Sequence, residues 1–380
     1  MPTDADPRSA PEPRLSLTLR AWKQCDRPDR VAAWDALAQW ASEPNPFYES
    51  WYLLASLRAL DPGGAVALIV LEADGQLAGL MPVKREARYY GYALPHWRNW
   101  AHANCFLGMP LVARGFERSF WREMLAWADR NAGRALFLHL AHLPVTGPLH
   151  EALAAELAAS GRPAATVLRE ERAMLVTQTP ATYLDSSLST KKRKELRRQH
   201  RRLAEQGELA TERCHDAAGL ESWIAEFLRI EQSGWKGRQG SALASTADTA
   251  QLFAQALQGA ASRGRLERLC LRLDGRPIAM LASFVAPPGA FSYKTAFDED
   301  FARYSPGVLL QRENIALLQR DAVSWIDSCA AEDHPMIDHI WRERRAIARH
   351  SIGIGGPLRR AAFAAIARRE TGRPARGIGA

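Results

Sequence analysis

The stretch FSYKTAFDEDFARYSPGVLLQREN, residues 291–314, indicates most about the fold of this 380-residue sequence. An aromatic and apolar run is followed by a polar loop, then by Pro306-Gly307, and then by a helix that we expect over 308–318. Proline lacks a backbone N–H and glycine lacks a side chain, so the pair fixes a helix start and leaves its first turn open to close approach. Helix N-termini favour anionic groups. The stretch predicts a phosphate-binding turn; an ordinary helix start with Pro-Gly chosen for geometry is the alternative.

A β-hairpin comes before this stretch, and it has a counterpart in the first half of the chain. Strands expected at 267–273 and 278–285 flank an Asp-Gly turn, and 290–297 adds a third antiparallel strand. Strands expected at 66–71 and 77–83 flank another Asp-Gly turn. Two helices precede each hairpin, and a helix and a strand follow it. We interpret this order as the duplication of one α+β unit, against a coincidence between two α/β halves.

The other periodic segments extend both units. Strands are expected at 15–22, 135–140 and 324–330, and helices at 31–40, 47–60, 116–130 and 149–160. A seam is expected near 161–178. The predicted parts are a disordered tail (1–14), an N-terminal unit (15–165), a C-terminal unit (166–358) and a final helix and tail (359–380), of which 368–380 is expected to be disordered.

Composition excludes several classes of protein and leaves others open. A net charge of +8 allows a phosphate cofactor, a nucleic acid or a membrane face as partner. The five cysteines are odd in number and form no CxxC pair, so neither a zinc ribbon nor a disulfide framework is indicated, and no metal is expected. No apolar run approaches the roughly 20 residues of a membrane helix, and the N-terminus lacks the apolar core of a signal peptide. We expect a cytoplasmic protein with reduced thiols and no membrane span.

Residues 303–308, RYSPGV, resemble the acyl-CoA-binding motif of the GNAT superfamily, Arg/Gln-x-x-Gly-x-Gly/Ala. Arg303 takes the first position, Pro306 and Val308 replace the two small residues, and Gly307 lies between them. This variant is similar to the CelD-type acetyltransferases, a branch related to the Fem peptidoglycan-bridge transferases. Further segments resemble that branch, at 187–209, 226–243, 274–280, 293–310 and 327–345.

The resemblance implies both a fold and a reaction. The fold is α+β, with two tandem GNAT-like domains, each a mixed, mostly antiparallel sheet flanked by helices. The reaction is direct acyl transfer from acetyl-CoA or another acyl-CoA to an amine or hydroxyl, on a small-molecule or saccharide acceptor. The CelD-type resemblance further implies a role in cellulose or exopolysaccharide synthesis, within a polysaccharide-synthesis complex. The residues implied for the co-substrate are Arg303, Ser305, Pro306, Gly307, Val308 and Leu309.

One difference from the Fem-type motif bears on whether the donor is aminoacyl-tRNA or acyl-CoA. Fem-type enzymes carry Tyr-Lys-x-x-Trp after the final strand, and the matching positions here are Ile337, Asp338 and Trp341. The aspartate in place of lysine disfavours an aminoacyl-tRNA donor and favours acyl-CoA. A Fem-like aminoacyl-tRNA-dependent transferase stays as one alternative. A non-catalytic protein that binds an anionic polymer is the other.

Acyl transfer needs a base for the attacking group, donors for the oxyanion and an acid for the thiolate. His334 is the first candidate base because a free imidazole titrates near neutrality. Asp298 is the second, acting through water, and Tyr304 is the candidate acid. Each can equally be a structural polar group. No cysteine stands beside a plausible base in this region, so transfer is expected to be direct.

Two further segments are candidates for substrate contact. The run KKRKELRRQHRR, 191–202, carries eight cations on one helix, and it is either a solvated face or a phosphate-binding face. It lacks interleaved aromatic residues, which disfavours nucleic acid. The glycine-bracketed loop 233–240 holds Trp235, either a stacking platform or a helix-end anchor. Alternation on the strand 290–297 is expected to point Tyr293 and Lys294 to opposite faces. The predicted substrate-binding residues are Trp235, Lys236, Tyr293, Lys294 and Asp333.

Overall fold

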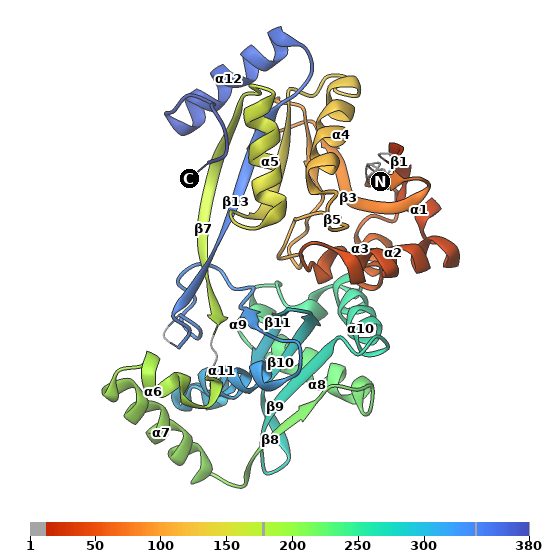
Figure 1. Ribbon diagram of the computed structural model, residues 1–380. Helices are drawn as coiled ribbons and strands as arrows, with labels where there is room; N and C mark the ends of the chain where they lie inside the picture. The colour runs from red at the N-terminus through yellow and green to blue at the C-terminus, as the bar shows by residue number, and fades with distance from the viewer. Residues whose placement is uncertain (1–12, 177–178, 339, 380) are drawn as a thin grey trace, which may run out of the picture.

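The computed structural model describes residues 13–176, 179–338 and 340–379, and these residues build one 13-stranded sheet flanked by helices (Figure 1). The strand order is β1-β2-β3-β4-β6-β13-β7-β12-β11-β10-β9-β8, with β5 paired to β3. Within the described residues only β4 with β6 and β11 with β12 are parallel. The predicted α+β class with a mostly antiparallel sheet is confirmed.

The first half of the chain runs from β1 to β7. Its elements are β1 (Leu15–Ala21), α1 (Trp22–Cys25), α2 (Pro28–Trp40), η1 (Pro46–Tyr48), α3 (Ser50–Leu60), β2 (Ala67–Ala73), β3 (Gln76–Glu86), β4 (His96–Asn99), β5 (Leu111–Val112), α4 (Glu117–Arg130), β6 (Phe137–Pro144), α5 (Pro148–Ala159) and β7 (Ala164–Val176). Asp74 and Gly75 both have positive φ angles, as the expected tight hairpin turn requires. The expected helices and hairpin are confirmed here.

The second half repeats that order. Its elements are η2 (Pro180–Thr182), α6 (Tyr183–Ser187), α7 (Thr190–Ala204), β8 (Leu209–Cys214), α8 (Leu220–Ser233), α9 (Trp235–Arg238), η3 (Leu243–Ser245), α10 (Ala247–Ala261), β9 (Leu266–Leu273), β10 (Arg276–Ala286), β11 (Gly289–Phe297), η4 (Glu299–Tyr304), α11 (Pro306–Asn314), η5 (Ile315–Gln319), β12 (Trp325–Asp327), β13 (Glu343–Gly353) and α12 (Pro357–Thr371). Asp274 and Gly275 form the second positive-φ turn. Each half therefore has a strand, two main helices, a hairpin, a strand, a helix and a strand.

The two halves interlock through their last strands, β7 and β13, which run side by side between the upper and lower parts of Figure 1. β13 belongs to the second half in sequence but pairs with β6 of the first. In return, the last residues of β7 pair with β12, at Met174–Val176. Strand β7 thus occupies the expected seam at 161–178. The division at residue 165/166 falls inside this strand and stays a prediction.

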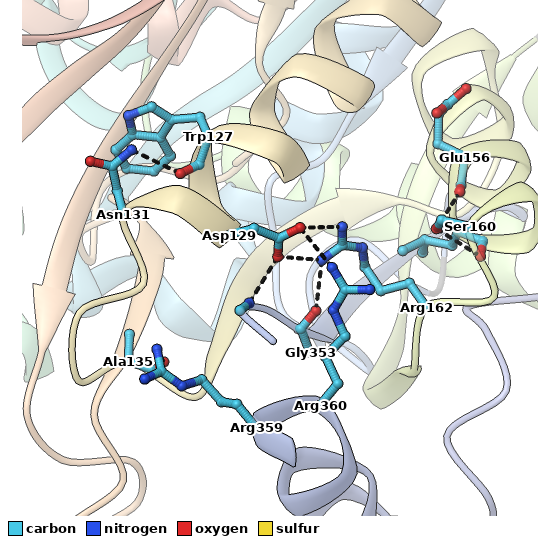
Figure 2. Close-up of polar contacts among 12 residues, drawn as sticks. Trp127, Asp129, Asn131, Ala135, Glu156, Ser160, Arg162, Gly353, Arg359 and Arg360 are labelled. Atoms are coloured by element: carbon cyan, nitrogen blue, oxygen red, sulfur yellow. Dashed lines mark hydrogen bonds and ion pairs between the residues drawn. The ribbon is translucent and has the colours of Figure 1, made fainter. Parts of the chain in front are cut away.

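The C-terminal helix α12 packs on β7 and β13 and is tied to the first half by Asp129. Figure 2 shows this carboxylate between Arg162 and Arg360, which donate to it at 2.8 and 2.6 Å. Beyond the helix, Gly377 N donates to Ala164 O at 3.0 Å and Ile378 is buried. The expected disorder of the C-terminal tail is wrong up to residue 379, because β7 offers it a backbone partner. Residues 1–12 of the expected N-terminal tail lie outside the described residues.

Candidate functional site

The candidate site lies where β11 and β12 part. They pair in parallel only over Gly289–Phe291 and Trp325–Asp327. β11 continues to Phe297, while the chain turns away after Asp327. A cavity of about 630 Å³ opens between them, and residues 292–297 line it. Beyond Phe291 the described strands pair with β11 only on its β10 side, so its other backbone edge faces this cavity.

Both halves of the chain build the cavity wall. The second half contributes the end of α8 and the start of α9, with Glu231, Trp235 and Lys236, together with the segment 328–331 and 334–337 that follows β12. The first half contributes Phe106, from the irregular chain between β4 and β5.

A β-bulge distorts β11 at the cavity. Ala282 pairs with Lys294 and Ser283 pairs with Ser292, which leaves Tyr293 without a partner on β10. Bulges interrupt the alternation of side chains along a strand. Lys294 Nζ lies 5.1 Å from the ring centre of Phe106, and the Tyr293 ring lies 6.2 Å from it. The expectation that Tyr293 and Lys294 point to opposite faces is wrong, because the bulge brings both to one side.

Lys294 is held by groups that come from the first half. Its Nζ donates to Asn104 Oδ1 at 2.6 Å. Burial, followed by the charge of Lys236, lowers the pKa of Lys294 to about 8. Lys236 itself donates to the buried Glu231 at 2.8 Å. Sequence reasoning missed Asn104, Phe106 and Glu231, since the first two lie in an irregular segment with no periodic signal.

His334 is half-buried and lines the same cavity. Its Nδ1 accepts a hydrogen bond from Met336 N at 3.4 Å. Burial lowers the pKa of His334, Asp338 opposes this shift, and Lys236 adds to it. The imidazole is therefore largely neutral at pH 7, as a proton acceptor must be. Its neighbour Asp333 is exposed, has a φ of 58°, and does not line the cavity.

Two other predicted catalytic residues lie elsewhere. Asp298 caps η4 by accepting from Asp300 N at 3.1 Å, and it also pairs with Arg276. Tyr304 is buried in the apolar cluster with Leu309 and Leu310. Neither side chain lines the cavity, so the structure gives each of them a packing or capping role. Their catalytic roles remain predictions.

The helix start at Pro306-Gly307 lies next to the cavity, behind Met336. Pro306 is the first residue of α11, as expected, and Ser305 before it is left-handed with a φ of 52°. A Cβ on Gly307 would lie 2.5 Å from Met336 Sδ. Met336 also lines the cavity, so its thioether separates the cavity from this glycine. A phosphate that approaches Gly307 from this cavity would meet the Met336 thioether, a terminal and flexible group.

The remaining predicted co-substrate residues surround this helix start. Arg303 is exposed on η4, with its guanidinium 4.7 Å from the Tyr304 ring centre. Val308 N and Leu309 N both donate to Ser305 O, at 3.0 and 3.1 Å. These two donors are therefore already used within the first turn.

The basic helix α7 also touches this helix start. Gln199 Nε2 donates to Ser305 Oγ at 3.2 Å, and Leu196 and Leu203 bury the inner face of α7. Ser189 accepts from Lys192 N and caps the helix. The exposed cations of the outer face are Lys191, Lys194, Arg197, Arg198, Arg201 and Arg202.

In the first half, the corresponding gap between β4 and β6 is filled. These strands pair in parallel at Trp97–Leu138 and Arg98–His139. Asn99 Nδ2 then donates to Ala141 O at 2.9 Å and to Gly108 O at 2.8 Å, while its Oδ1 accepts from Ala141 N. A Cβ on Gly108 would clash with Ala141 O. Polypeptide thus closes this gap, whereas the gap beside β11 is a cavity.

Within residues 13–176, 179–338 and 340–379, no group of three or more His, Cys, Asp or Glu side chains is arranged to hold a metal ion. No described helix has the length and apolarity needed to cross a bilayer.

A part of the second half is similar to a known protein family. Residues 190–334 match the family model of the acetyltransferase (GNAT) domain. No curated protein matches the sequence.

Solved structures share the fold over most of both chains. FemX is 12% identical with a TM-score of 0.55, over 86% of this chain and 97% of FemX. A protein of unknown function from Bacteroides thetaiotaomicron VPI-5482 is 11% identical, with a TM-score of 0.52, over 85% and 97%. The DUF2156 domain of a putative lysylphosphatidylglycerol synthetase from Agrobacterium fabrum is 15% identical, with a TM-score of 0.51, over 92% and 98%.

At these identities the structural likeness shows the fold alone, and the CelD-type resemblance stays a prediction. The predicted α+β fold, two repeated units on a mostly antiparallel sheet, is confirmed, and the second unit matches the GNAT domain over residues 190–334. The chain carries an acetyltransferase (GNAT) domain at residues 190–334, and it is an acyltransferase.

Proposed function

We propose that this protein transfers an acyl group from acyl-CoA, with acetyl-CoA as the first candidate, directly to an amine or hydroxyl bound in the cavity. One observation supports this most: the parting of β11 and β12 exposes a strand edge and a bulge beside the start of helix α11. A strand edge offers N–H and C=O groups to an extended, amide-containing chain such as pantetheine. The helix start offers a favourable position for phosphate.

His334 is the proposed general base. It lines the cavity, and its lowered pKa leaves it neutral and able to take a proton from an attacking ammonium or hydroxyl at pH 7. Backbone N–H groups at the β11 bulge are the proposed donors for the oxyanion. Asp298 and Tyr304 are engaged in capping and packing, so we assign them no direct step.

Cys329 lines the cavity but does not suit covalent transfer. Burial and the neighbouring Asp327 carboxylate raise the pKa of its thiol well above the ordinary value. Such a thiol stays protonated at neutral pH, and the thiol form is a poor nucleophile. This supports a ternary complex, with direct transfer from donor to acceptor.

For the acceptor, the biosynthetic role and the cellular compartment, we propose only a general class. Exposed Trp235 at the cavity rim suits stacking on a sugar ring, which supports a saccharide or small-molecule acceptor. The link to cellulose or exopolysaccharide synthesis, and to a complex for that synthesis, rests on the CelD-type resemblance. All five cysteines are free, which supports a reducing compartment such as the cytoplasm.

A second candidate is a Fem-like transferase that uses aminoacyl-tRNA. It is favoured by the fold shared with FemX and by the exposed cations of α7. Asp338 disfavours it, because an aspartate stands where that resemblance implies a lysine.

The test is donor binding followed by transfer. Calorimetry with acetyl-CoA should show saturable binding, and thiol release should follow when amines and amino sugars are added. Transfer from charged tRNA, with no heat from millimolar acetyl-CoA, would favour the second candidate. Binding of neither donor would overturn both.

A further inference from the structure

Lys294 is a half-buried cation without an acidic partner. Among the described residues no carboxylate pairs with it. Its Nζ contacts the neutral Asn104 amide, and it lies 5.1 and 5.7 Å from the ring centres of Phe106 and Tyr293. An amide oxygen and two aromatic faces stabilise an ammonium only in part.

The carboxylate that acts electrostatically on this lysine, Glu231, already has its own partners. Glu231 accepts from Lys236 Nζ through Oε1 and from Leu243 N through Oε2, each at 2.8 Å. The cavity wall holds two ammonium groups, Lys236 and Lys294, and two carboxylates, Glu231 and Glu299. Glu299 pairs with Arg238 at 2.7 Å, so Lys294 is the one ammonium of the described lining without a carboxylate partner. Desolvated charges are costly unless they are paired, so a cavity with an unpaired ammonium favours an anionic ligand.

The groups that face Lys294 come from four separate segments. They are Lys236 on α9, Glu231 on α8, the Cys329 thiol after β12, and His102 in the chain before Asn104. Burial and the Lys294 charge lower the pKa of His102 to about 3, so it is neutral. Lys236 is the repelling charge, and Glu231 only partly balances it.

We propose that Lys294 binds an anionic group, a carboxylate or a phosphate, that the acceptor carries, and that Asn104 positions the Lys294 ammonium. The inference rests on the proposed acyl transfer and names the class of acceptor. Amino acids, amino-acid termini and phosphorylated amino sugars fit, and neutral amines do not. Since Asn104 and Phe106 belong to the first half, that half takes part in selecting the acceptor while the second half binds the donor.

The experiment compares acceptors that differ only in charge. Glucosamine 6-phosphate is paired with glucosamine, and β-alanine with its amide, at saturating acetyl-CoA. A charged hydrogen bond predicts that kcat/KM is about 10- to 100-fold higher for the charged member of at least one pair. Lys294→Met should reduce this preference to about one, and Lys294→Arg should retain it. Lys191→Met, on the outer face of α7, is the matched control and should change nothing.

Asn104→Asp tests the positioning role without removing the lysine. The new carboxylate would pair with Lys294 and cancel its charge, so the preference for anionic acceptors should disappear. The pKa of Lys294 is about 8. The wild-type protein should therefore lose its preference for anionic acceptors between pH 7 and 9, as Lys294 deprotonates. Lys294→Arg should keep the preference across that range.

Three outcomes would overturn the inference. One is equal preference in wild type and Lys294→Met. Another is a preference for the acyl group instead of the acceptor. If wild type favours succinyl-CoA over acetyl-CoA and Lys294→Met does not, the anion belongs to the donor. The third is calorimetric binding of glucosamine 6-phosphate that Lys294→Met leaves unchanged. Because this third measurement needs no turnover, it separates failure of the inference from failure of the proposed function.

Discussion

Arg172 Nη2 donates to Asp327 Oδ2 at 2.7 Å, and this buried ion pair joins β7 of the first half to β12 at the edge of the cavity. Arg345 Nη1 on β13 donates to the same oxygen at 2.9 Å. Asp327 Oδ1 accepts from Cys329 N at 2.9 Å, which fixes the direction in which the chain leaves β12. Burial alone would raise the pKa of Asp327, but the two arginines hold it below its ordinary value. The junction between the halves therefore also shapes the cavity.

Asp327→Ala should lower the free energy of unfolding by about 3–5 kcal/mol, because Arg172 would be left buried without its counter-ion. Urea denaturation followed by circular dichroism measures this change. Arg118→Ala is the control, since its pair with Glu156 is largely exposed on the Arg118 side and should contribute about 0–1 kcal/mol. Similar losses in the two variants would contradict a structural role for the junction.

Replacing His334 by glutamine should lower kcat about 10²- to 10⁴-fold while acetyl-CoA affinity is kept. The lowered pKa of His334 also predicts how the activity depends on pH below neutrality. The imidazole is active when neutral, so wild-type activity should fall only as the pH drops below the ordinary histidine value of about 6.5. The variant should lack this acidic decline. A wild-type rate in His334→Gln, or an unchanged decline, would identify another base.

The elements with strong local signals could be predicted from the sequence. Both Asp-Gly hairpins and the helix that begins at Pro306 are confirmed, because the residues that specify them are adjacent in the chain. Strands β7 and β13 were missed. Their sequences are rich in charge, and each is stabilised by partners from the other half, which local patterns do not encode.

The site could be predicted only in part, for the same reason. Lys236, Lys294 and His334 line one cavity, as their predicted roles require. From the first half, Phe106 lines it and Asn104 accepts from Lys294, and no periodic pattern marks either residue. Contacts between the two halves of the chain therefore could not be predicted from the sequence, and the three-dimensional structure was needed to find them.

Met336→Ala should strengthen acetyl-CoA binding several-fold, because the thioether that covers Gly307 would be gone. Gly307→Glu should weaken binding by at least tenfold, about 1.4 kcal/mol, through bulk and like charge beside the phosphates. The Met336→Ala/Gly307→Glu double variant tests whether the backbone at residue 307 binds the donor. If the backbone at residue 307 binds the donor, the double variant binds as poorly as Gly307→Glu, and wild-type affinity there would exclude this site. Melting temperature serves as the control for folding.

One donor should bind per chain, although the fold is duplicated. Asn99 and Gly108 close the gap between β4 and β6 that corresponds to the cavity beside β11. Calorimetry with acetyl-CoA should therefore give a stoichiometry of one, and a value of two would show that the first half also binds the donor. Gly108→Ala would force a methyl group against Ala141 O, so we expect a loss of about 1–3 kcal/mol of stability. Its kcat/KM at a temperature where it is folded should equal that of wild type, because the filled gap supports the fold and takes no part in transfer.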